Sequence, residues 1–209
     1  MPHAVLVGDS IFDNGPYVGP GEAVVDALTP LLPAGWDVTL NARDGSVTSE
    51  VAAQMARRPA GASHLLISCG GNDALGHLGL LQASCGSVHQ ALAMLAQPVA
   101  AFRTGYQAML SLARSTGLQL TVCTVYDAVP GLDAATRLAL TLFNDVILRE
   151  AWVQKIDVLD LRAIATDATD YAAVSPIEPS AIGARKIASA LSALLQAPAD
   201  TMAARVFAG

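Results

Sequence analysis

Residues 5–15, VLVGDSIFDNG, join an apolar run to a cluster of small and polar residues. The run over residues 4–7 is continuous, as expected of a parallel strand that is covered on both faces of its sheet. It stops at Gly8, Asp9 and Ser10, so a serine hydroxyl follows the carboxyl end of a predicted buried strand. Ligands of parallel sheets bind beyond the carboxyl ends of the strands. Ser10 is therefore either a turn residue or a nucleophile, and the rest of the sequence must decide between the two.

The composition is typical of a globular chain. Of its 209 residues, 53% are hydrophobic and 14% are charged, which excludes a disordered chain. This length suits one domain, and we expect a single domain over residues 1–209. The net charge is −6 and no cluster of Lys and Arg exists, so we expect no nucleic-acid partner.

Cysteine usage and the lack of long apolar runs indicate the compartment. Cys69, Cys85 and Cys123 form no C-x-x-C pair and no metal-ligand spacing, which is typical of free thiols in a reducing compartment. No basic and apolar leader precedes the first predicted strand. Residues 74–102 lack Asp, Glu, Lys and Arg, but polar residues, glycines and Pro98 interrupt them, so no membrane span is expected. We expect a cytoplasmic protein with neither metal nor organic cofactor. The sequence does not indicate an oligomeric state.

Strand-like and helix-like segments alternate along the chain. Apolar runs predict five buried strands, at residues 3–8, 36–41, 64–70, 118–126 and 156–161. Helical patterns follow them at residues 22–32, 46–58, 87–114, 133–154 and 179–196. This alternation predicts an α/β fold with one doubly wound, five-stranded parallel sheet. The Ala-rich tail at residues 199–209 is expected to be peripheral.

Small and polar residues follow three of these strands. Ser10 follows the first strand, Gly45 the second and Asn72 the third, so all three are expected at one edge of the sheet. A hydroxyl and two possible N–H donors are the parts that acyl transfer needs, since it requires a nucleophile and donors aimed at an oxyanion. Each residue alone is more often an ordinary turn residue. Their shared order and placement favour a site.

The chain resembles the GDSL, or SGNH, hydrolases in these motifs. GDS follows the first strand, a glycine follows the second and GGND follows the third, and the strand–helix alternation fits over nearly the whole chain. The resemblance implies a flavodoxin-like, three-layer α/β/α sandwich and a serine esterase or lipase. It also implies Ser10 as the nucleophile, with an oxyanion hole made by the backbone amides of Ser10 and Gly45 and the side chain of Asn72.

The last motif of that family, Asp-x-x-His before a helix, is changed in this chain. In SPIEPSAIGARKIA, Ser175 stands at the aspartate position and Glu178 at the histidine position. One interpretation makes Glu178 the general base to Ser10, with Ser175 orienting its carboxylate. The reference pKa of glutamate is about 4.3, against about 6.5 for histidine, so Glu178 is the weaker base unless burial raises its pKa. Pro179 is predicted as the first helical residue and Glu178 as the N-cap, where the helix dipole would lower that pKa.

Two other interpretations stay open. Another histidine could replace the missing one: His3 and His64 begin strands, His89 falls in an early helical turn, and His77 follows GGND at the expected active edge. Alternatively, the chain is a catalytically inactive protein of this fold that binds a carbonyl or carboxylate ligand. Because the serine, glycine and asparagine all remain, we favour an enzyme that cleaves small-molecule carboxylic esters through an acyl-enzyme on Ser10.

Further residues have expected places around this edge. Asp9 is expected to brace the loop of Ser10, and Tyr126 and Asp127, which end the fourth predicted strand, to wall the pocket. The uncharged loop over residues 74–87 is expected to cover the site. Its leucines, Leu75, Leu78 and Leu80, would contact an acyl chain or pack on the core.

Overall fold

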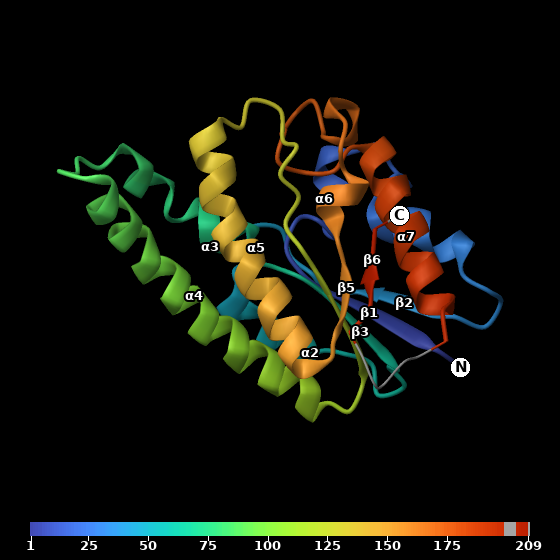
Figure 1. Ribbon diagram of the computed structural model, residues 1–209. Helices are drawn as coiled ribbons and strands as arrows, with labels where there is room; N and C mark the ends of the chain where they lie inside the picture. Colours follow the sequence, from blue (N-terminus) through green and yellow to red (C-terminus); the bar gives the residue numbers. More distant parts are fainter. Residues whose placement is uncertain (199–203, 209) are drawn as a thin grey trace.

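The computed structural model describes residues 1–198 and 204–208, and within them the strands form one parallel sheet (Figure 1). The strand order is β2-β1-β3-β4-β5-β6, and each neighbouring pair is parallel. The strands are β1 (His3–Gly8), β2 (Asp37–Leu40), β3 (His64–Ser68), β4 (Gln119–Cys123), β5 (Asp157–Leu159) and β6 (Val206–Phe207).

Helices cover both faces of the sheet. They are α1 (Val24–Leu28), α2 (Val51–Ala56), α3 (Gly71–Leu75), α4 (Val88–Ser115), α5 (Ala134–Gln154), α6 (Leu161–Ile164) and α7 (Ala181–Gln196). Short 3-10 turns join them at η1 (Gly15–Tyr17), η2 (Thr29–Leu31), η3 (Thr48–Glu50), η4 (Leu78–Gln82) and η5 (Ala168–Asp170). No helix within the described residues is long and apolar enough to cross a bilayer.

Strand β1 shows how the three layers form. Ala4 and Leu6 point to one face and pack with the buried residues of α1, α6 and α7. Val5 and Val7 point to the other face and pack with α2, α4 and α5. Side chains alternate between the two faces of a strand, so a continuous apolar run buries both faces at once. The predicted three-layer α/β/α sandwich is confirmed, with α2, α4 and α5 together on one side of the sheet (Figure 1).

The sheet has one strand more than predicted. Val206–Phe207, in the tail expected to be peripheral, pairs in parallel with β5 as β6. A two-residue strand has no alternation to read in the sequence. Residues 199–203 and 209 of this tail lie outside the described residues.

Two predicted helices are shorter than expected. The segment at 22–32 ends its α-helix at Leu28 and continues as η2, which contains Pro30, because proline lacks the N–H that a helix interior needs. The segment at 46–58 begins with η3 and becomes α-helical only from Val51 to Ala56.

Candidate active site

Strand β1 ends at a glycine whose place no other residue can take. Gly8 has φ +123°, and an added Cβ would lie 1.7 Å from the carbonyl oxygen of Ser68 on β3. The next amide, of Asp9, donates a 2.9 Å hydrogen bond to the same Ser68 oxygen. This close approach turns the chain over the carboxyl end of β3 and places Ser10 at the sheet edge, with 8% of its surface exposed.

Glu178 reaches Ser10 from the loop before α7. Its side chain is buried, with 4% exposed. Burial raises the pKa of the Glu178 carboxyl above its usual value, and the charge of Asp44 adds to this rise. The hydroxyls of Ser175 and Ser10 lie against the same carboxyl, and their hydrogen bonding acts in the opposite direction on the pKa. The Glu178 Oε2 atom is buried without a hydrogen-bond partner among the described residues.

The start of α7 differs from the prediction. The N-cap is Ser180, whose Oγ accepts hydrogen bonds from the amides of Ile182 and Gly183. Pro179 lies before the helix and forms an isolated bridge with Tyr171. The prediction that Pro179 is the first helical residue and Glu178 the N-cap was therefore wrong. Serine is among the strongest N-caps, and its side chain, not the position of the proline, sets this helix start.

Two buried side chains hold the backbone on either side of Glu178. Asn14 Nδ2 donates a 3.1 Å hydrogen bond to the carbonyl oxygen of Pro179. Tyr126 Oη donates a 2.5 Å hydrogen bond to the carbonyl oxygen of Ile177. Asn14 lies in the loop after Ser10 and Tyr126 follows β4, so the Glu178 loop is tied to the carboxyl ends of two strands.

The predicted oxyanion donors lie on neighbouring loops of this edge. Asn72 is the second residue of α3, and its Nδ2 donates a 3.0 Å hydrogen bond to the carbonyl oxygen of Ser46. That bond holds the asparagine against the loop that contains Gly45. In the described part of the chain, neither the Ser10 amide nor the Gly45 amide donates a hydrogen bond to another residue. Ser10 and Asn72 line the same pocket, whereas Gly45 is not among its lining residues, so the structure does not place all three donors at one cavity wall.

Gln54, on α2, connects the loop of Gly45 to β1, the strand that precedes Ser10. This role was not predicted from the sequence. Its Oε1 accepts a 2.6 Å hydrogen bond from the Gly8 amide. Its Nε2 donates to the Gly8 carbonyl at 2.9 Å and to Ser46 Oγ at 3.1 Å. The only signal in the sequence is a polar residue on the helix face that buries Val51 and Met55.

Asp9 braces the loop of Ser10, as predicted. Its Oδ1 accepts hydrogen bonds from Ser68 Oγ at 2.9 Å and from the Ile11 amide at 3.2 Å. Only 2% of Asp9 is exposed, and this burial raises the pKa of its carboxyl to about 7. This shift of the pKa could not be predicted from the sequence, because the residues that bury Asp9 are far apart in the chain.

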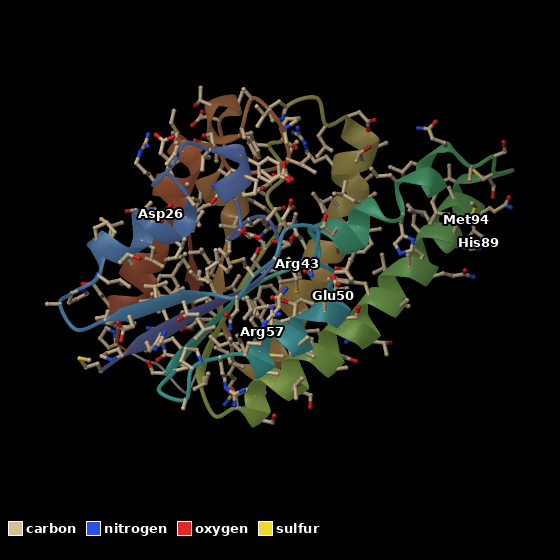
Figure 2. The ribbon with its side chains drawn as sticks, turned by 180° about the vertical axis from the view of Figure 1, so that it is seen from behind. Asp26, Arg43, Glu50, Arg57, His89 and Met94 are labelled. Atoms are coloured by element: carbon tan, nitrogen blue, oxygen red, sulfur yellow. The ribbon has the colours of Figure 1, made fainter. Side chains whose placement is uncertain are left out.

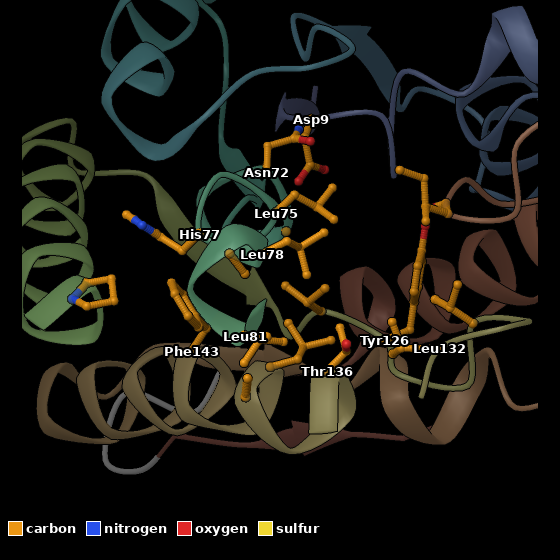
Figure 3. A pocket seen from close by; sticks show the side chains of 18 of the residues that line it. Asp9, Asn72, Leu75, His77, Leu78, Leu81, Tyr126, Leu132, Thr136 and Phe143 are labelled. Atoms are coloured by element: carbon orange, nitrogen blue, oxygen red, sulfur yellow. The ribbon is translucent and has the colours of Figure 1, made fainter. Parts of the chain in front are cut away.

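An apolar pocket begins beside Ser10 and extends between α3, η4, α4 and α5 (Figure 3). Asp9, Ser10 and Asn72 line its polar end. Most of its remaining wall is apolar and includes Leu75, Leu78, Leu81, Leu132, Leu140 and Phe143. Tyr126 lines the pocket as predicted, whereas Asp127 is not among its lining residues. Leu80, expected either beside an acyl chain or packed on the core, lines a second hollow against α4.

No histidine hydrogen-bonds Ser10 or Glu178 within the described residues. His77 is exposed and lines the pocket, and its ring points away from Asp9 and Asn72 (Figure 3). His89 lies near the start of α4, in the part of the helix that projects from the sheet (Figure 2). The same described residues contain no group of three His, Cys, Asp or Glu side chains that could hold a metal ion.

Sequence comparison finds no matching family model and no matching curated protein. Solved structures match over most of the chain. A lipase from a goat rumen metagenome has a TM-score of 0.72 at 20% identity, covering 92% of this chain and 96% of that one. A lipolytic protein of the G-D-S-L family from Veillonella parvula has a TM-score of 0.67 at 17% identity, covering 94% and 98%. An acetyl xylan esterase, AlAXEase, has a TM-score of 0.68 at 14% identity, covering 92% and 99%. The predicted SGNH hydrolase fold is confirmed.

Proposed function

We propose that this chain is a serine hydrolase of carboxylic esters, in which Ser10 is the nucleophile and Glu178 the general base. The observation that carries the proposal is the buried Glu178 carboxyl lying against the Ser10 hydroxyl at the carboxyl edge of the sheet. A carboxylate with a raised pKa is a better proton acceptor than an exposed one. The lipase and the acetyl xylan esterase among the structures of this fold support ester hydrolysis as the reaction.

In the acylation step, Ser10 Oγ attacks the ester carbonyl carbon and its proton passes to Glu178. The carbonyl oxygen becomes an oxyanion, which accepts hydrogen bonds from the amides of Ser10 and Gly45 and from Asn72 Nδ2. The tetrahedral intermediate then breaks its bond to the alcohol oxygen. Glu178 returns the proton to that oxygen, so that the alcohol leaves neutral and the acyl group stays on Ser10.

In the deacylation step, water attacks the acyl carbon and gives its proton to Glu178. The bond to Ser10 Oγ breaks and the serine recovers the proton, so the carboxylic acid is released and the site is restored. Ser175 is a positioning residue in this scheme, because its hydroxyl contacts the carboxyl of Glu178 and not the reacting atoms. The roles of the aspartate and histidine in the related motif thus pass to a hydroxyl and a carboxylate.

The test combines turnover with covalent labelling. Hydrolysis of p-nitrophenyl esters, from acetate to decanoate, is measured for the wild type and for Ser10→Ala. We expect turnover of at least one ester above the buffer rate, lost in the variant. A fluorophosphonate should also form a bond from phosphorus to Ser10 Oγ with loss of fluoride, detected by peptide mass spectrometry. Absence of both turnover and labelling would overturn the proposal and leave the ligand-binding alternative.

A further inference from the structure

We infer that the acyl group of the substrate is an unbranched apolar chain, well longer than acetyl, that lies in the pocket between α3, η4, α4 and α5. The inference rests on the proposed function and names its substrate class. It also separates two kinds of ester hydrolase that share this fold, because one similar structure is described as a lipase and another as an acetyl xylan esterase.

The positions of the reacting groups set the direction in which the substrate must lie. The ester carbonyl has to meet Ser10 and the Asn72 amide, and both line the polar end of the pocket. Glu178 has to reach the alcohol oxygen in order to return its proton, and the pocket is lined by the neighbouring Ile177 but not by Glu178 itself. The alcohol part therefore leaves on the side of Glu178, and the pocket receives the acyl part.

The wall of the pocket is mainly apolar. Leu75 and Leu78 lie next to the polar end, and Leu81 lies farther along, toward α5 (Figure 3). Asp9 and His77 are the acidic and basic residues of the lining, and the wall from residue 74 to residue 102 carries no Asp, Glu, Lys or Arg. A sugar or charged acyl group would leave polar atoms unpaired against these leucines, which is unfavourable. A hydrocarbon chain meets no such penalty.

A longer acyl chain should increase kcat/KM as long as it buries more apolar surface. Burial of one methylene group raises kcat/KM by roughly a factor of four while the chain still finds apolar wall. An octanoyl group has six carbons more than an acetyl group, and the apolar wall of the pocket would cover them. We therefore expect kcat/KM for p-nitrophenyl octanoate to exceed that for the acetate by at least 100-fold.

Ala139 provides a variant that shortens the pocket. It lies on α5 and lines the pocket with a small side chain. In Ala139→Trp the indole would occupy the space of the distal acyl carbons, so the octanoate-to-acetate ratio of kcat/KM should fall at least tenfold. Leu138→Trp is the matched control, because Leu138 is the next residue of the same helix, is 68% exposed and is absent from the lining. Its ratio should equal that of the wild type.

A binding measurement keeps the inference separate from catalysis. Ser10→Ala protein is titrated with decanoate by calorimetry, alone and with Ala139→Trp added. Saturable binding that Ala139→Trp weakens supports the acyl pocket even if no ester is turned over, in which case only the proposed function fails. Turnover that is fastest with acetate, or an octanoate-to-acetate ratio that Ala139→Trp leaves unchanged, would overturn the inference while the proposed function stands. Neither turnover nor decanoate binding would overturn both.

Discussion

The side chain of Asn14 spans 165 residues of sequence to reach the carbonyl oxygen of Pro179, with a donor–acceptor distance of 3.1 Å. Asn14 Oδ1 at the same time accepts a 2.9 Å hydrogen bond from the amide of Val24, at the start of α1. One buried amide thus joins the loop after Ser10, the first helix and the segment that carries Glu178. The nucleophile and its proposed base therefore hold their relative position through backbone contacts as well as through their own side chains.

Asn14→Ala should weaken both the fold and the site. The substitution leaves the Pro179 carbonyl and the Val24 amide without their buried partner, which should cost roughly 2–4 kcal/mol in the free energy of unfolding. Because the Glu178 loop also loses its anchor, kcat should fall by more than the small unfolded fraction explains. Urea unfolding gives the first quantity, and ester turnover far below the urea midpoint gives the second.

Ser192→Ala provides the control for this prediction. Ser192, on α7, is also buried and donates a 3.0 Å hydrogen bond to a carbonyl oxygen, that of Leu31, away from Ser10. Its loss should cost about 1 kcal/mol of stability and leave kcat as it was. Equal effects of the two substitutions on kcat would mean that Asn14 supports the fold alone.

The proposed base makes a prediction about pH. Glu178 must be ionised to accept a proton, so kcat/KM should fall as the pH drops through the raised pKa of its carboxyl. Glu178→Gln removes the proton acceptor and should lower kcat roughly 100- to 10,000-fold. The double change Ser175→Asp with Glu178→His should retain turnover and move the acid limb to about pH 6.5, the ordinary pKa of histidine.

The competing base gives the contrary outcome. If His77 accepted the proton, His77→Ala would remove the acid limb of the pH profile, and Glu178→Gln would leave it in place. His77 is exposed and its ring is directed away from Asn72 (Figure 3). We therefore expect Glu178→Gln, and not His77→Ala, to remove the acid limb. The two single variants therefore decide between the assignments on the same pH profile.

The sheet edge was predictable from the sequence because it depends on topology. Ser10, Gly45 and Asn72 each follow an apolar run, and parallel strands bring such positions to one edge without any knowledge of side-chain contacts. The start of α7 at Ser180 was harder to predict from the sequence. Pro179 is typical of a first helical residue and Ser180 of an N-cap, and these two signals lie one residue apart. Strand β6 was not predictable, because two residues carry no period.

The supporting side chains could not be predicted because their partners are remote. Gln54 meets Gly8 across 46 residues, and Tyr126 meets Ile177 across 51. Each bond joins a side chain to a backbone atom, so no pairing of residue types in the sequence marks it. The raised pKa of the Asp9 carboxyl also depends on residues that are remote in the sequence, because these bury it.

Asp9 should make the protein less stable as the pH rises. The pKa of its carboxyl is about 7 in the fold, against roughly 3.9 in an unfolded chain, so the unfolded chain releases the proton first. The stability that Asp9 contributes is present below pH 4 and is lost as the pH rises through 7. Asp9→Asn keeps an acceptor for Ser68 Oγ and the Ile11 amide but does not ionise, so its stability curve should be flatter in this window.

The measurement for Asp9 is the difference in unfolding free energy between the wild type and Asp9→Asn, taken by urea titration from pH 4 to pH 8. The difference should shift in favour of the variant by a few kcal/mol across this range. Other titrating groups are common to both proteins and cancel. Parallel curves would show that the Asp9 carboxyl ionises in the fold as readily as in the unfolded chain.

Gln54 should affect the rate of chemistry more than the binding of the acyl chain. Gln54→Leu leaves the buried amide and carbonyl of Gly8 without their side-chain partner, at a cost of roughly 2–4 kcal/mol in unfolding free energy. It also removes the bond to Ser46 Oγ, which ties the Gly45 loop to the nucleophile strand. Since Gln54 does not line the pocket, kcat should fall with little change in KM.

Met55→Leu is the control, because it is a buried, volume-conserving change on the same helix and should leave kcat unchanged. An equal loss of kcat in both variants would refute the positioning role of Gln54.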